Sequence, residues 1–192
     1  MVNREHRIPG KRLLDTGSSP LIIIHHSLAR GRLVAEARDW IGTPYHHQAS
    51  VKGVGCDCLG LVRGVWRTVV GPEPEKIPGY SNDWGEARGH EAMLDAGRRH
   101  FVEIAPEHAL PGDVVVFRIH PRRVARHAGI LTGARTFVHA QEGAPVCEVA
   151  ISPWWIRRIA SAFRFPEVAK CEAARTEQSA AVTTRLCHLP VA

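Results

Sequence analysis

The chain has 192 residues, 44% of them hydrophobic and 23% charged, with a formal net charge of +6 at pH 7. These values are typical of one globular domain that buries a core of its own, and they exclude a chain that is disordered throughout. The positive charge favours a polyanionic partner, for which nucleic acid, a membrane surface and an anionic cell wall all qualify.

Cysteine usage and hydropathy exclude further classes of protein. None of the five cysteines falls in a Cys-x-x-Cys pair or in the Cys/His spacing of a zinc site. We therefore expect neither a disulfide framework nor a metal site. The apolar run Leu21–Ile24 ends after four residues, which is too short for a signal peptide or a membrane span. We expect a protein that is made in the cytoplasm without a signal peptide and does not insert into a membrane.

Residues 1–27 are basic and rich in turn-forming residues, and we expect this N-terminal extension to be poorly ordered. It contains one distinctive motif, Asp15-Thr16-Gly17, which resembles the catalytic loop of aspartic peptidases. That chemistry needs two aspartates that share a proton, and the motif occurs once in the chain. A dimer would have to supply the second aspartate, so we favour a polar turn.

A helix is predicted over residues 28–41, where apolar residues recur at helical spacing and charged residues occupy the opposite face. Gly42 and Pro44 end it, because glycine terminates helices and proline cannot continue them. The loop that follows contains the pair His46-His47. No carboxylate or cysteine joins these histidines at ligand spacing, so we interpret them as loop residues and not as a metal site.

The next helix begins at Cys58, from which large or apolar residues recur at i, i+3, i+4, i+7, i+8 and i+11, up to Val69. Asp57 stands immediately before it, where a short acceptor side chain caps a helix. The N–H groups and the macrodipole at this end favour a thiolate, so we expect a lowered pKa for Cys58. A cysteine on an apolar helix face can equally be a small core residue, and this stretch alone does not decide between the two.

After a Pro/Gly-rich loop at residues 71–79, a third helix is predicted near 83–99. Short apolar segments separated by turn residues then predict strands over residues 101–104, 114–117, 127–132, 136–140, 146–151 and 159–165. Helices first and strands afterwards indicate an α+β fold, with helices packed on a short antiparallel sheet. Residues 28–166 form the predicted domain, and residues 167–192 are predicted to be a flexible tail.

The strands at 127–132 and 136–140 form a predicted hairpin that carries His127 and His139. Side chains alternate between the faces of a strand, so the length of the connecting loop decides where the two histidines lie. A three-residue loop (132–134) would place them opposite each other on one face. A two-residue loop would place them on opposite faces.

Cys58, His127 and His139 together form the layout of a cysteine nucleophile with its base. A thiolate attacks a carbonyl, an imidazole takes up the thiol proton and returns it to the leaving amine, and a third group orients the imidazole. The chain has twelve histidines, so accidental pairs are expected and spacing alone leaves this assignment open.

Five segments carry a resemblance to a known family: Gly42–Tyr45, Asp57–Val62, Pro111–Val114, His127–Ile130 and Phe137–Ala140. Together and in this order they resemble the NlpC-type papain-like cysteine peptidases of bacterial cell walls. The amino-acid sequence of residues 55–66 is similar to that of the family members found in phage and gene-transfer-agent tails.

The resemblance covers roughly residues 30–165 and implies a papain-like, NlpC-like fold. It implies a peptidoglycan endopeptidase that cuts stem peptides without a cofactor, typically at the bond between D-γ-glutamate and a diamino acid. By motif, Cys58 would be the nucleophile, His127 the base and His139 the orienting residue. Tyr45 would stabilise the oxyanion or position the substrate, although it could simply pack at a loop edge, and Asp57 would be structural.

Two features depart from the family. Leu59 stands where the family usually has serine, and residues 79–100 are additional to its small core. No wall-binding module is visible, so we expect the partners to be proteins of a phage-like tail that delivers the enzyme to the cell wall.

Two other functions stay open. The same fold could serve as a tail-tip protein that binds without catalysis, although the complete Cys/His/His set argues against it. The same residues could also carry thiol amidase or acyltransferase chemistry on another substrate. Nucleic-acid binding rests on charge alone, and we do not expect it.

Overall fold

The computed structural model describes residues 20–80, 90–166, 168–170 and 173. Most of the predicted N-terminal extension and of the predicted tail therefore lies outside the described residues. So do residues 81–89, which contain the first part of the predicted third helix. Val168, just past the predicted end of the domain, is buried in the main core.

Within the described residues, three α-helices precede the main sheet: α1 (Pro20–Asp39), α2 (Cys58–Val69) and α3 (Ala92–His100). α1 begins before the predicted start at residue 28. Proline is favoured at the first position of a helix, but the three consecutive isoleucines at residues 22–24 have a low helix propensity and did not indicate a helix. α3 begins later than predicted, because residues 90 and 91 are not helical. None of the described helices is long and apolar enough to cross a bilayer.

The strands of the main sheet lie close to their predicted positions: β3 (Val102–Ile104), β4 (Val114–Phe117), β5 (His127–Gly133), β6 (Thr136–His139), β7 (Cys147–Ala150) and β8 (Ile159–Arg164). Short elements that were not predicted are β1 (Ser50–Val51), β2 (Gly55–Cys56), the 3-10 turn η2 (Pro106–His108) and α4 (Pro153–Ile156). The predicted α+β class is confirmed.

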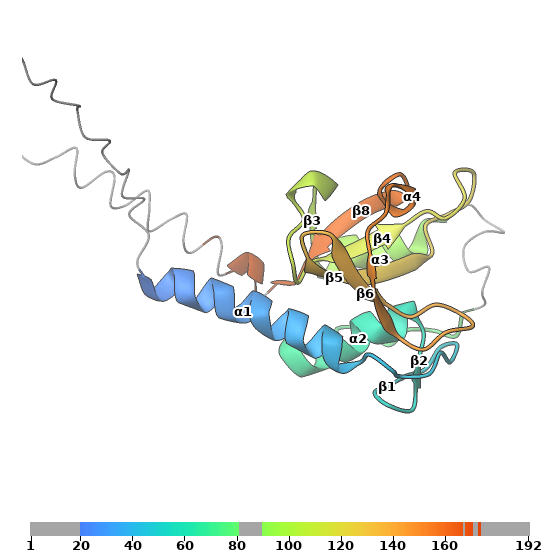
Figure 1. Cartoon of the computed structure of the whole chain (residues 1–192), viewed down its shortest axis with the longest axis horizontal. Helices are drawn as coiled ribbons and strands as arrows, with labels where there is room; N and C mark the ends of the chain where they lie inside the picture. The colour runs from blue at the N-terminus through green and yellow to red at the C-terminus, as the bar shows by residue number, and fades with distance from the viewer. Residues whose placement is uncertain (1–19, 81–89, 167, 171–172, 174–192) are drawn as a thin grey trace, which may run out of the picture.

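The main sheet has the strand order β3-β8-β4-β5-β6-β7, with all neighbouring strands antiparallel. β8, the last of the described strands, lies between β3 and β4 in the sheet. Helices α1 and α2 lie side by side on one face of the sheet (Figure 1).

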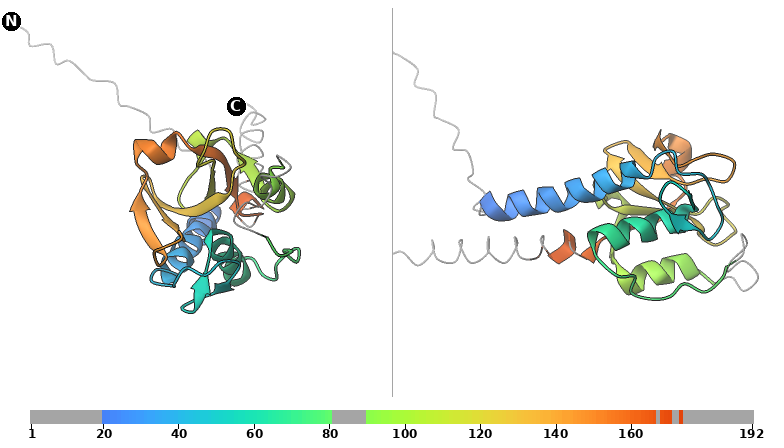
Figure 2. Two further views of the ribbon diagram at one scale, coloured as in Figure 1. Left: turned by 90° about the vertical axis from the view of Figure 1, so that its right-hand side faces the viewer. Right: turned by 90° about the horizontal axis from the view of Figure 1, so that it is seen from below.

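Apolar side chains fill both faces of this sheet. The larger cluster lies between the helices and the sheet and includes Leu33, Leu61, Val65, Ile130 and Phe163. The smaller cluster, on the opposite face, consists of Val115, Phe117, Leu131, Phe137 and Ala162, with the half-buried Trp155 against it. Figure 2 shows that the sheet curves strongly.

The β5–β6 hairpin decides where the two histidines lie. Residues 134–135 form a two-residue turn, which in a regular hairpin would put His127 and His139 on opposite faces. A bulge between Leu131 and Gly133 adds one residue to β5 and shifts the register. The two histidines therefore share a face after all, but they lie diagonally and not directly opposite each other.

Candidate active site

Asp57 holds the first turn of α2. Its backbone is extended, and its Oδ1 accepts a hydrogen bond from the N–H of Gly60 at 2.7 Å, which is the predicted N-cap. Its Oδ2 accepts a hydrogen bond from the N–H of Gln48, also at 2.7 Å. The carboxylate thus ties the loop at residues 45–48 to the start of the helix, where Cys58 is the first residue.

Burial determines the chemical state of Cys58. Its thiol donates a hydrogen bond to the backbone carbonyl of Arg126, at 3.8 Å from sulfur to oxygen. Burial, helped by the charge of Asp57, raises the pKa of Cys58 to about 12, although N–H groups at the helix start and at Ala128 lower it. The expected lowering of this pKa is therefore wrong for this conformation, because desolvation outweighs the helix terminus.

His127 and His139 are hydrogen-bonded to each other. Nε2 of His127 lies 2.9 Å from Nδ1 of His139. This contact leaves Nδ1 of His127 as the ring nitrogen that can exchange a proton with the thiol. Burial lowers the pKa of His127 to about 3, with a contribution from His139, and burial lowers the pKa of His139 to about 4. Both imidazoles are therefore neutral at physiological pH.

Trp155 packs on this histidine pair. Its ring is stacked on His127, with centroids 5.6 Å apart at 25°, and it meets His139 edge-on at 5.4 Å. The indole restricts the rotation of His127 and shields the histidine hydrogen bond from water. Sequence analysis missed this residue, since Trp155 lies between two predicted strands and shows no motif or periodicity.

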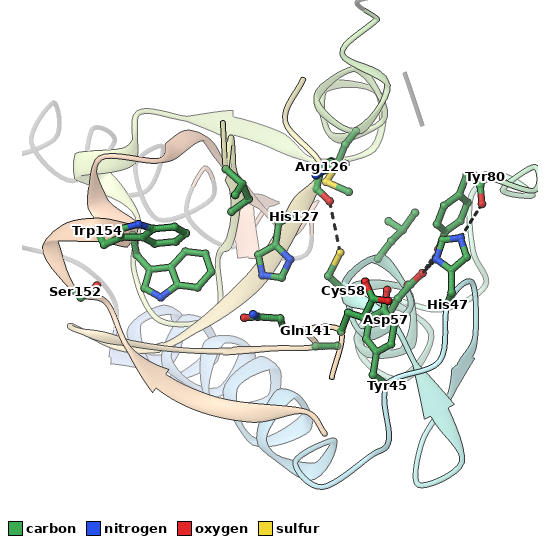
Figure 3. Close-up of a pocket in the computed structure, with 16 residues that line it drawn as sticks. Tyr45, His47, Asp57, Cys58, Tyr80, Arg126, His127, Gln141, Ser152 and Trp154 are labelled. Carbon is green, nitrogen blue, oxygen red and sulfur yellow. Dashed lines mark hydrogen bonds and ion pairs between the residues drawn. The ribbon is translucent and has the colours of Figure 1, made fainter. Parts of the chain in front are cut away.

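Four of the five predicted site residues line one cavity of about 770 Å³: Tyr45, Asp57, Cys58 and His127. Figure 3 shows Cys58 and His127 facing each other, with Tyr45 and Asp57 beyond the sulfur and Trp154 beyond the imidazole. His139 does not line the cavity and acts on it only through His127.

Tyr45 enters the cavity from the loop that follows α1. Burial, together with the negative charge of Asp57, raises the pKa of Tyr45 to about 12. Its hydroxyl is therefore protonated near neutral pH and can donate a hydrogen bond to a developing oxyanion. The arrangement as a whole can perform nucleophilic acyl transfer, with Cys58 attacking and His127 moving the proton.

The NlpC/P60 family model matches residues 42–164, well over half of the chain. The chain belongs to the NlpC/P60 family. The family indicated by the five sequence motifs is thus confirmed.

Two curated NlpC/P60 relatives illustrate the similarity. The chain is 31% identical over 134 residues to the gamma-DL-glutamyl hydrolase of Bacillus subtilis, covering 69% of this chain and 29% of that protein. It is 26% identical over 136 residues to the murein DD-endopeptidase MepS/murein LD-carboxypeptidase of Escherichia coli K12, covering 70% and 62%. The chain therefore spans less than two thirds of the length of either relative.

Solved structures confirm the NlpC-like fold. The NlpC/P60 domain of the peptidoglycan hydrolase SagA superposes with a TM-score of 0.50 at 24% identity, covering 71% of this chain and 98% of that domain. An NlpC/P60 family protein from Bacillus cereus superposes with a TM-score of 0.52 at 21% identity, covering 71% and 40%. At these identities the similarity shows the fold alone.

This NlpC/P60 site contains two further side chains whose role the sequence did not indicate. Tyr80, the second of the two tyrosines of the chain, donates its hydroxyl to Oδ2 of Asp57 at 2.6 Å. His47, interpreted above as a loop residue, lines the cavity with Nδ1 at 3.6 Å from the same oxygen. Tyr80 lies in a Pro/Gly-rich loop without periodicity, so only the tertiary structure brings it to Asp57.

Proposed function

We propose that the chain is a cysteine endopeptidase that hydrolyses peptidoglycan stem peptides at the bond between D-γ-glutamate and a diamino acid. The observation that carries this proposal is the shared cavity of Cys58 and His127, with His139 hydrogen-bonded to the far nitrogen of His127. The names of the NlpC/P60 relatives, a γ-glutamyl hydrolase and a murein endopeptidase, support the substrate class.

The first step is acylation of Cys58. Because burial keeps the thiol and the imidazole neutral, Sγ attacks the substrate carbonyl as its proton moves to Nδ1 of His127. This requires the tautomer in which Nε2–H of His127 donates to Nδ1 of His139, which then stabilises the imidazolium. Tyr45 donates to the oxyanion of the tetrahedral intermediate.

The second half of the reaction restores the enzyme. The imidazolium of His127 gives its proton to the amine of the diamino acid as the C–N bond breaks, leaving a thioester on Cys58. A water molecule then gives a proton to His127 and attacks the thioester, which releases the glutamyl carboxylate and returns the proton to sulfur. Every proton taken up by His127 is returned, so the reaction needs no co-reactant besides water.

The test is the replacement of Cys58 by alanine in the full chain. We expect kcat for a γ-D-glutamyl–diamino acid peptide to fall by roughly 10³-fold or more, with the thermal unfolding midpoint nearly unchanged. The matched control is Cys56→Ala, which removes the neighbouring cysteine, fully buried and at the end of β2, and should retain activity. Equal hydrolysis by the Cys58→Ala variant would refute the proposal. Release of product only by transfer to an added amine would favour an acyltransferase.

We further propose that the enzyme is incorporated in a phage-like tail and acts at the cell wall. The amino-acid sequence of residues 55–66, which resembles tail-associated members of the family, supports this assignment to a tail. The net charge of +6 suits an anionic wall. Mass spectrometry of purified tail particles should detect the chain. Its absence from particles, together with its presence in a wall fraction of cells that make none, would contradict tail association.

A further inference from the structure

Tyr80 connects two parts of the site. Its hydroxyl donates to Oδ2 of Asp57 at 2.6 Å, and its carbonyl oxygen accepts a hydrogen bond from the side-chain amide of Gln48, also at 2.6 Å. The same carbonyl lies 2.9 Å from Nε2 of His47, whose ring meets that of Tyr80 edge-on at 5.2 Å. In Figure 3 Tyr80 and His47 lie next to Asp57, on the side of the cavity away from His127. Tyr80 therefore contacts both the helix cap and the loop that carries Tyr45.

The segment that ends in Tyr80 is anchored to the helices. Glu73 forms ion pairs with Arg63, at 2.7 Å, and with Arg67, both on α2. Glu75 forms an ion pair with Arg99 of α3 at 2.8 Å. Since α2 is also the helix that Asp57 caps, the segment is attached to α2 at both ends. The ion pairs of this segment thus hold Tyr80 in place beside Asp57.

We propose that Tyr80 is a positioning residue that prepares Cys58 for attack by fixing the carboxylate of Asp57. The proposal rests on the proposed function, because it takes Cys58 as the nucleophile. One oxygen of Asp57 caps Gly60, and the other is held by the N–H of Gln48 and the hydroxyl of Tyr80. Together these bonds fix the plane of the carboxylate, and with it the first turn from which the sulfur projects.

The hydrogen bond also has an electrostatic effect. The charge of Asp57 opposes ionisation of Cys58, and a hydroxyl that donates to this carboxylate draws part of the charge away from the sulfur. The other titratable groups that face Asp57 include His47, at 3.6 Å, Tyr45 across the cavity, and the buried Cys56, whose pKa the charge of Asp57 also raises. Removal of the Tyr80 hydroxyl leaves more negative charge facing the thiol and should reduce its reactivity.

The decisive variant is Tyr80→Phe, which removes one oxygen and keeps the ring and the backbone carbonyl. We measure alkylation of Cys58 by iodoacetamide between about pH 6 and about pH 9, read by mass spectrometry at each cysteine. The rate at Cys58 should fall roughly three- to tenfold, as for a pKa raised by about half a unit to one unit. With a stem peptide, kcat should fall by a similar factor while KM changes little.

The matched control is Thr132→Val. It removes a hydroxyl that also donates to a carboxylate at 2.6 Å, that of Glu148, at a distance from the cavity. It should change stability without changing alkylation of Cys58. Adding Tyr80→Phe to an Asp57→Asn variant should have little further effect on the alkylation rate, because Tyr80 acts through the charge of Asp57.

Two outcomes would overturn the inference. One is an unchanged alkylation rate in Tyr80→Phe, and the other is a fall of the same size in the control, which would show a general loss of stability. Alkylation needs no substrate, so it tests Tyr80 even if the wild-type chain hydrolyses no stem peptide. That last result would refute the proposed function alone.

Discussion

Cys58 and His127 are half-buried, and the loss of solvent around their reactive atoms keeps both of them neutral. A preformed thiolate–imidazolium pair would need solvent or compensating charge, and the nearest charge, that of Asp57, has the wrong sign for a thiolate. The imidazole is therefore available as a base, and the nucleophile is generated only as the proton moves. His139 and Trp155 hold the imidazole in the orientation that this transfer requires.

The histidine pair predicts a dependence of stability on pH. The pKa values of His127 and His139, about 3 and about 4, lie below the ordinary value of 6.5, so between these limits the folded chain binds fewer protons than the unfolded chain. The contribution of the two neutral histidines to the free energy of unfolding is fully present above pH 6.5 and is lost as the pH falls toward 3. Urea unfolding over this range should show a smaller decline for His139→Gln than for the wild type. The exposed His120→Gln should leave the decline unchanged, and an equal decline in all three proteins would contradict the assignment.

At the scale of elements, the position of the site depends on how closely α2 approaches its neighbours. A Cβ at Gly64 would lie 1.9 Å from the ring of Trp40, the residue that follows α1, so the contact of α2 with the end of α1 requires glycine. The start of α2 is equally close to the loop before it, since a Cβ at Gly60 would lie 1.9 Å from the carbonyl oxygen of Ala49. These contacts hold the start of α2, and with it Cys58, against the loop that precedes the helix.

Two glycine-to-alanine substitutions should have opposite effects. Gly64→Ala should lower the free energy of unfolding by about 1–3 kcal/mol, because the methyl group forces Trp40 to move. Gly31→Ala, on the exposed side of α1 with open space at its Cβ, should raise it by about 0.5–1 kcal/mol through helix propensity. Denaturant unfolding of both variants checks the pair. A stable Gly64→Ala protein would show that the two helices can separate at no cost.

At the scale of the whole molecule, Asp113 connects the beginning, middle and end of the domain. It is fully buried just before β4, and its carboxylate pairs with Arg30 of α1 at 3.1 Å and with Arg164 of β8 at 3.1 Å. The same side chain accepts a hydrogen bond from the N–H of Leu110 at 2.9 Å. The motif residue Asp113 is therefore structural and lies away from the cavity.

Asp113→Ala should lower the free energy of unfolding by about 3–5 kcal/mol, because it removes the buried carboxylate that the buried Arg30 and the half-buried Arg164 share. Arg98→Ala breaks an exposed ion pair with Glu103 and should leave the unfolding midpoint nearly unchanged. Thermal unfolding of both variants tests the difference. Similar midpoints for the two would mean that the Asp113 network contributes little.

The sequence by itself determined the features that depend on neighbours along the chain. Apolar spacing located α2 and the strands of the main sheet, and the short acceptor side chain of Asp57 located the cap. Five motifs in order indicated the family. These signals are local, because helix and strand periods and capping involve residues a few positions apart.

Only the tertiary structure decided the properties that depend on contacts through space. Burial reversed the expected pKa shift of Cys58, since desolvation is a property of the packed core and not of a helix start. The bulge in β5, and not the turn length, placed His127 and His139 on one face. Tyr80 and Trp155 reach the site from segments without periodicity, because closure of the fold brings distant residues together and leaves no local pattern in the chain.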